Sequence, residues 1–148
     1  MNIIKTIKLY WMKLRGKVEV HEVFNEDLDD IMKQRSSNYY ERLDGFYTTC
    51  DMETMKTLVE FMPIRLRKWK KGFPDCDDMA YDFWRIVKNL FPTLAIGVCH
   101  VKIEDSRSKH AMCWCVVRLK SGRNSFYFIE PETGKMYFPN FSPYMMLI

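Results

Sequence analysis

Apolar residues recur at helical spacing between Pro74 and Pro92, and this stretch organises the predicted fold. The members of the apolar face are Met79, Ala80, Phe83, Trp84, Ile86, Val87, Leu90 and Phe91. Pro74 and Asp75 are typical of a helix start, and Pro92 ends the run. Cys76 lies four residues before Ala80. It therefore falls on the same inward face, in the first helical turn.

The rest of the pattern predicts helices before this stretch and strands after it. Amphipathic helices are expected at residues 25–35 and 51–61, a short strand at 17–24, and an irregular aromatic segment at 39–49. Later strands are expected at residues 95–103, 110–119, 125–130 and 135–138, with turns at 120–124 and 131–134. The pattern predicts one α+β domain over residues 1–148, whose central helix packs on an antiparallel sheet of three or four strands.

The two ends of the chain are predicted to pack on this domain. Ile and Trp side chains in residues 1–15 fall on one helical face opposite lysines, which favours a docked arm. The alternative for this arm is a segment that binds a membrane surface or a partner. The apolar tail, residues 139–148, contains two prolines and is expected to be extended.

Composition excludes several classes of protein. A hydrophobic content of 47% over 148 residues excludes a disordered chain. The net charge of +4 is mild, so the basic residues at 65–71 are expected to be solvated, and no nucleic-acid partner is expected. No signal peptide or membrane span is predicted. Five cysteines, an odd number, favour a reducing compartment and a cytoplasmic location.

A thiol, an imidazole and two carboxylates are predicted to meet at one end of the sheet. A hairpin centred near Ser121 would pair position 110 with 132 and position 112 with 130. His110, Glu130 and Glu132 then share one face of the sheet, and either carboxylate lies within reach of the imidazole. Cys76 at the helix start supplies a possible nucleophile, which needs a base and a group that orients the base.

These residues resemble a known family. The strings Asp75-Cys76-Asp77-Asp78, His110-Ala111 and Ile129-Glu130-Pro131-Glu132-Thr133 resemble the papain-like cysteine peptidase domain of the Marasmius-type fungal agglutinins. They are equally similar to related small proteins of bacteria and their phages. The resemblance covers residues 39–137 and departs from the pattern at Glu132, where glutamine is common, and at Cys113, where asparagine is common.

The resemblance implies a papain-like fold with Cys76 as nucleophile, His110 as base and Glu130 as orienting acid. Calcium is a possible cofactor by the same resemblance, with Asp75, Asp77 and Asp78 as possible ligands, although acids in a first helical turn also act as caps. Trp69 and Phe73, which precede the cysteine, are possible substrate-cleft residues. Residues 69–75 contain no glutamine or asparagine for an oxyanion site, which leaves Lys70, Lys71 or a more distant group.

Two functions from different classes follow. The main prediction is a cysteine hydrolase of the peptidase or amidase type that acts on a protein or peptide through a thioacyl-enzyme. The alternative is a catalytically silent binding module with the same fold, such as a phage accessory or host-inhibiting protein. A third possibility is structural zinc on Cys99, His100, His110, Cys113 and Cys115, although alternating cysteines in a strand are more simply core residues.

Overall fold

The computed structural model describes residues 21–23, 25–35, 40–41, 46–61, 75–102, 109–138, 143 and 145–147. Its helices are α2 (Asn25–Arg35), α3 (Met52–Phe61) and α4 (Cys76–Leu90). Its strands are β1 (His21–Val23), β2 (Tyr40–Glu41), β3 (Tyr47–Asp51), β4 (Ile96–Lys102), β5 (Lys109–Arg118), β6 (Asn124–Glu130), β7 (Lys135–Tyr137) and β8 (Met145–Leu147).

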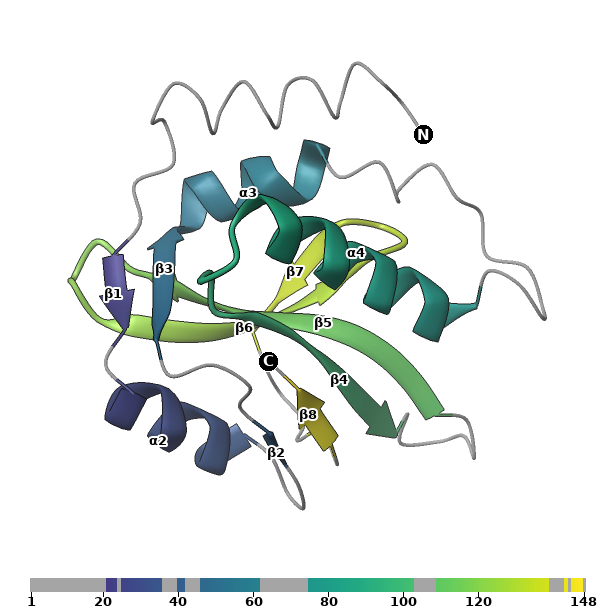
Figure 1. The fold of residues 1–148 in the computed structure, drawn as a ribbon, viewed down its shortest axis with the longest axis horizontal. Helices are drawn as coiled ribbons and strands as arrows, with labels where there is room; N and C mark the ends of the chain where they lie inside the picture. The colour runs from purple at the N-terminus through teal and green to yellow at the C-terminus, as the bar shows by residue number, and fades with distance from the viewer. Residues whose placement is uncertain are drawn as a thin grey trace.

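Strand β5 lies at the centre of one sheet. The sheet runs in the order β1-β3-β5-β4-β8-β2, and β6 pairs with β5 and with β7. Most pairs are antiparallel, but β3 pairs with β5 and β2 with β8 in parallel. Helices α3 and α4 lie on one face of this sheet and α2 lies on the other (Figure 1).

The two faces of β5 belong to two separate cores. Ala111, Cys113, Cys115 and Val117 pack with α3 and α4. The alternate residues, which are Met112, Trp114 and Val116, pack with Leu28 and Met32 of α2 and with Phe126 and Phe128. Because side chains alternate along a strand, a continuous apolar run is what a strand covered on both faces requires. The cysteines at 113 and 115 are therefore core residues of the α4 side.

The predicted helices at 25–35 and 51–61 and the predicted later strands are confirmed. The expected helices at 25–35 and 51–61 are α2 and α3, and the four expected later strands are β4 to β7. The hairpin register is also confirmed, because β5 and β6 pair Cys113 with Ile129 and Arg118 with Asn124. This register, continued by one step, pairs 112 with 130.

Two predictions about the fold are wrong. Residues 39–49 were expected to be irregular, but they contain β2 and most of β3. Among the described residues the sheet has eight strands rather than three or four, because β1, β2, β3 and β8 join it. The expectation of an extended tail is confirmed for Met145–Leu147, which form β8 and bond to β4. Short strands such as these are set by long-range pairing, which local pattern does not reveal.

The arm at residues 1–15 and the basic cluster at 65–71 lie outside the described residues. Among the residues that the structure describes, no helix is long and apolar enough to cross a membrane.

Candidate functional site

Helix α4 begins at Cys76 with a complete capping box. The Asp75 side chain accepts from the Asp78 backbone N–H at 3.3 Å, and the Asp78 carboxylate accepts from the Asp75 N–H at 3.3 Å. These bonds satisfy backbone N–H groups that the first helical turn leaves without partners. On the inner face, Ala80, Phe83 and Val87 are buried, and this burial fixes the helix on the sheet. Cys76 is thereby held close to the first residues of β5, near the backbone of Ala111.

The Cys76 thiol is half-buried and favours its protonated form. Burial raises the pKa of this thiol, and a hydrogen bond to Asp77 together with the charges of Asp77 and Asp75 raises it further. The backbone N–H of Ala111 acts in the opposite sense, toward a lower pKa, but it does not outweigh burial. The sulfur donates to Asp77 Oδ1 at 3.4 Å. A thiol in this environment is a poor nucleophile.

His110 and Glu130 form the strongest polar contact of the site. Nε2 of His110 lies 2.6 Å from Oε2 of Glu130, and the side chains are 25% and 16% exposed. The other carboxylate oxygen of Glu130 accepts from the backbone N–H of Glu132 at 3.4 Å. The hydrogen bond to Glu130 raises the pKa of His110, an effect opposed by burial and reinforced by the charges of Glu130, Asp77 and Glu132. Of the two carboxylates that the sequence left open, Glu130 is the one bonded to the imidazole.

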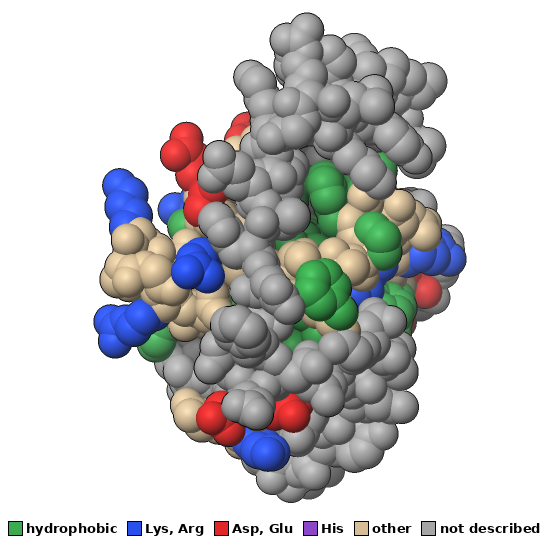
Figure 2. Space-filling view, turned by 60° about the vertical axis from the view of Figure 1, so that its left-hand side comes forward, with side chains coloured by type: hydrophobic (Ala, Val, Ile, Leu, Met, Phe, Trp, Pro, Cys, Tyr) green, Lys and Arg blue, Asp and Glu red, His purple; other side chains and the backbone are tan. Residues whose placement is uncertain are grey.

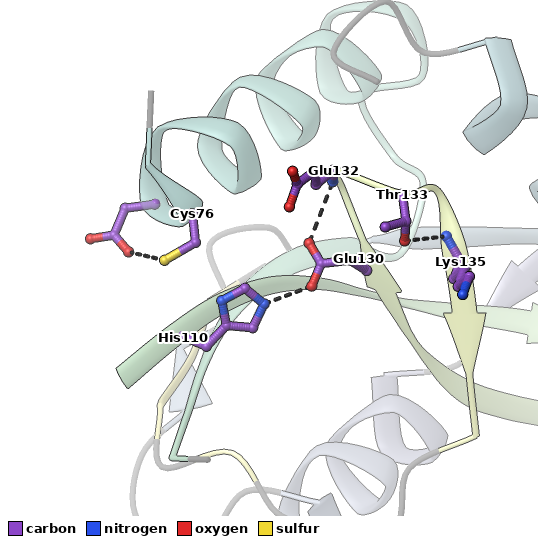
Figure 3. A network of polar contacts seen from close by, with 7 residues as sticks. Cys76, His110, Glu130, Glu132, Thr133 and Lys135 are labelled. Atoms are coloured by element: carbon purple, nitrogen blue, oxygen red, sulfur yellow. Dashed lines mark hydrogen bonds and ion pairs between the residues drawn. The ribbon is translucent and has the colours of Figure 1, made fainter. Parts of the chain in front are cut away.

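The thiol and the imidazole lie near one another without a hydrogen bond between them. Figure 3 shows Cys76 at the start of the helix and His110 at the end of the neighbouring strand, with the imidazole turned toward Glu130. Within the described part of the chain, the hydrogen bonds of Cys76 and His110 go to Asp77 and Glu130 and not to each other.

Several residues predicted for the site have other roles in the structure or lie outside the residues that it describes. Trp69, Lys70, Lys71 and Phe73 fall among residues that are not described. The carboxylates of Asp75 and Asp78, suggested as calcium ligands, are used by the capping box. No group of three or more His, Cys, Asp or Glu side chains in the described ranges could hold a metal ion.

The cysteines considered for zinc are buried core residues. Cys99, Cys113 and Cys115 are each fully buried, and burial raises the pKa of all three thiols. Cys99 packs in the core on the α2 side, whereas Cys113 and Cys115 pack on the α4 side. Cys113 donates its S–H to the carbonyl of Ala80 at 3.2 Å. The three thiols are thus dispersed over two faces of the sheet, whereas a structural zinc site needs its ligands gathered around one point.

An exposed aromatic side chain, Tyr81, lies beside this site and was not among the predicted site residues. Tyr81 is 37% exposed, contacts the Trp84 ring edge to face at 6.5 Å, and lies 6.3 Å from the His100 ring. Burial and the charge of Asp77 raise the pKa of Tyr81. Its position four residues after Asp77 places both on one side of α4. That spacing was the signal that could have identified it.

The fold and the site together define an α+β protein with a half-exposed polar cluster at the start of its central helix. No protein-family model matches the chain, and no curated protein sequence matches it. Solved structures share the fold, and two of them serve as examples. PSL1a in complex with E-64 has 18% identity and a TM-score of 0.73, and the match covers 86% of this chain and 51% of that one.

The second similar structure is a Polyporus squamosus lectin bound to a human-type influenza-binding epitope. It has 17% identity and a TM-score of 0.69, and the match covers 87% of this chain and 49% of the lectin. This chain therefore spans about half the length of either protein. At such low identity the likeness shows the fold.

These comparisons correct two predictions. The chain was expected to belong to a papain-like peptidase family, but no family model matches it, and the two similar structures described above are named for a lectin and for PSL1a rather than for a peptidase. The main functional prediction, a cysteine hydrolase, is wrong on the same findings, which fit the alternative better. In the same structure, burial raises the pKa of the Cys76 thiol, and the sulfur donates to Asp77 rather than to His110.

Proposed function

We propose that the protein is a binding module that keeps a papain-like arrangement of helix and sheet without turnover. Its binding site is the polar cluster at the start of α4, made of Asp77, Tyr81, His110 and Glu130, and the Cys76 thiol lies beside it without contributing to binding. The single observation that carries the proposal is the pair of His110 and Glu130, which is closely bonded yet partly exposed, beside a thiol that stays protonated. Such a pair presents a fixed polar surface to a ligand.

The charges around the cluster favour a particular kind of ligand. Asp77 and Glu132 both act on the imidazole of His110 electrostatically, so both carboxylates lie close to the cluster. Carboxylates repel phosphates and attract cationic groups, which argues against a nucleic acid and for a protein segment that carries lysine or arginine. The exposed ring of Tyr81 adds an aromatic surface on which a cation or an apolar side chain can pack. The proposed ligand is a peptide segment of a partner protein.

The proposal is tested by binding rather than by turnover. The full chain is applied to an array of immobilised peptides of varied charge, and the dissociation constant of the best peptide is measured by isothermal titration for each variant. We expect Cys76→Ser to bind as the wild type does, because the thiol is not the attacking group. Tyr81→Ala should weaken binding by about fivefold to tenfold, which corresponds to one exposed aromatic contact.

A matched control is Tyr137→Ala, since Tyr137 is 41% exposed and lies on β7 rather than α4. The control should bind as the wild type does. The proposal would be contradicted if peptide binding required Cys76. It would also be contradicted if the Tyr81 and Tyr137 variants bound the peptide with equal affinity. A glycan array probed in parallel separates the ligand classes, and binding there without binding to peptides would overturn the peptide ligand.

A further inference from the structure

A groove lies at the other end of β5 from His110. It has a volume of about 650 Å³, and its walls are the start of α3 and the turn that joins β5 to β6. Figure 2 shows the side of the molecule on which this turn lies: Lys and Arg side chains gather at its left, and Asp and Glu side chains lie above them. The residues of the groove belong to none of the interactions of the α4 site.

The turn that forms one wall is held by its own backbone. The N–H of Leu119 donates to the carbonyl of Arg123 at 2.8 Å, and the N–H of Gly122 donates to the carbonyl of Leu119 at 2.9 Å. Gly122 has a φ of 82°, a conformation that a side chain would strain. The groove is therefore preformed, so a ligand does not have to order this wall on binding.

The floor of the groove is apolar. Met52 and Leu119 line it, and both are partly buried residues packed against the core of α3 and α4. Their exposed atoms give a ligand an apolar surface whose removal from water favours binding.

The described lining residues of the groove carry three positive charges against two negative ones. Lys56, Arg118 and Lys120 line the groove, and none of them has an ion-pair partner among the described residues. Asp51 also lines it, but both of its carboxylate oxygens are bonded at 2.8 Å to the backbone N–H and the hydroxyl of Thr54. Asp51 thus caps α3, and Glu53 is the remaining acid among the described lining residues.

We propose that this groove binds a short peptide segment in which an acidic side chain neighbours an apolar one. The carboxylate would pair with Arg118 and Lys120, and a guanidinium is suited to hold it by two parallel hydrogen bonds. The apolar side chain would cover Met52 and Leu119. A segment bound here differs in charge from the ligand proposed for the α4 site, so the two proposals stand or fall separately.

The test uses two acetylated and amidated tetrapeptides. The acidic probe is Leu-Asp-Leu-Glu, and the neutral probe is Leu-Asn-Leu-Gln, which keeps its shape. Each is titrated into the isotope-labelled full chain, and amide chemical shifts are followed by nuclear magnetic resonance. We expect saturable shifts for the acidic probe at Leu119, Lys120 and Gly122. The neutral probe should bind about fivefold or more weakly, as the loss of an ion pair predicts.

Three variants locate the contact. Lys120→Gln changes an exposed turn residue with little risk to folding, and Arg118→Gln removes the proposed bidentate donor; each should weaken the acidic probe by about fivefold. Lys102→Gln, at the end of β4, is the control and should leave affinity unchanged. Equal affinity for both probes, shifts centred on His110 rather than on the groove, or no saturable shift would each overturn the proposal.

Discussion

Replacement of Glu130 by glutamine tests the pair on which the binding site rests. The substitution keeps the size of the side chain and removes its charge. Oε2 of Glu130 is 2.6 Å from His110 Nε2 and Oε1 accepts from the Glu132 N–H, so an amide can satisfy at most one of these two donors with its single oxygen. Both the charge interaction and one hydrogen bond are disturbed.

The expected loss follows from the exposure of the pair. Hydrogen bonds to charged groups contribute about 1.5–3 kcal/mol when they are buried, whereas exposed ion pairs contribute at most about 1 kcal/mol. The side chains of His110 and Glu130 are 25% and 16% exposed, which is intermediate. We therefore expect Glu130→Gln to lower the free energy of unfolding by about 1.5 kcal/mol at pH 5.5.

The loss should depend on pH in one direction. Because Glu130 raises the pKa of His110 in the folded protein, the charged pair stabilises the fold fully below the pKa of an unfolded histidine, about 6.5. That contribution disappears as the pH rises through the folded-state pKa. The difference between wild type and variant should therefore shrink at pH 8.5, and the pKa of His110 should fall in the variant.

Urea unfolding followed by tryptophan fluorescence measures the free energies at both pH values, since Trp114 is fully buried. The Hε1 resonance of His110 reports its pKa. Glu132→Gln is the matched control, because its carboxylate acts on His110 only through its charge while its backbone N–H bonds to Glu130, and it should have a smaller effect. A loss that stays the same or grows between pH 5.5 and pH 8.5 would refute the reasoning.

Three further predictions concern α4. Cys76 should react with iodoacetamide slowly at pH 6–7, in the wild type and in His110→Ala alike, because the pKa of its thiol is raised. Peptide mass spectrometry measures the labelling. Fast labelling that depends on His110 would contradict the binding proposal. Asp75→Ala should lower the free energy of unfolding in urea by about 1 kcal/mol through loss of the cap, and Asp75→Asn should restore most of it. Phe83→Ala should cost about 3–5 kcal/mol, and a loss below about 1 kcal/mol would show that α4 does not rest on the core.

The hairpin and the central helix could be predicted because local signals define them. Proline, aspartate and an apolar stripe define α4, and turn residues between two runs of β-forming residues define β5 and β6. The register then followed from the position of the turn. This register places His110 and Glu130 on one face of the sheet, which agrees with the 2.6 Å contact between their side chains.

Strands β3 and β8 could not be predicted because their partners lie far away in the sequence. Thr49 on β3 donates its hydroxyl to the Val116 carbonyl across 67 positions. Met146 on β8 pairs with Cys99. Neither segment has a run long enough to be recognised as a strand, and both exist because β5 and β4 offer free edges.

The hydrogen bonds of Cys76 could not be predicted, because spacing in a helix and register in a sheet are separate local signals. Helical spacing placed the sulfur inward, and hairpin register placed the imidazole beside Glu130. The packing that brings Cys76 of α4 close to Ala111 of β5 is a long-range contact that neither signal contains. The acids beside Cys76 were recognised as unfavourable to a thiolate, and in the structure the thiol donates to one of them.

Strand β5 carries His110 near its first residue and Arg118 at its last. Eight residue steps of about 3.3 Å separate their backbones by roughly 26 Å along an element that is covered on both faces and hydrogen-bonded on both edges. One tetrapeptide cannot reach both ends. The two proposed ligands would therefore bind without competition, and the strand between their sites would fix the distance at which two partners are brought together.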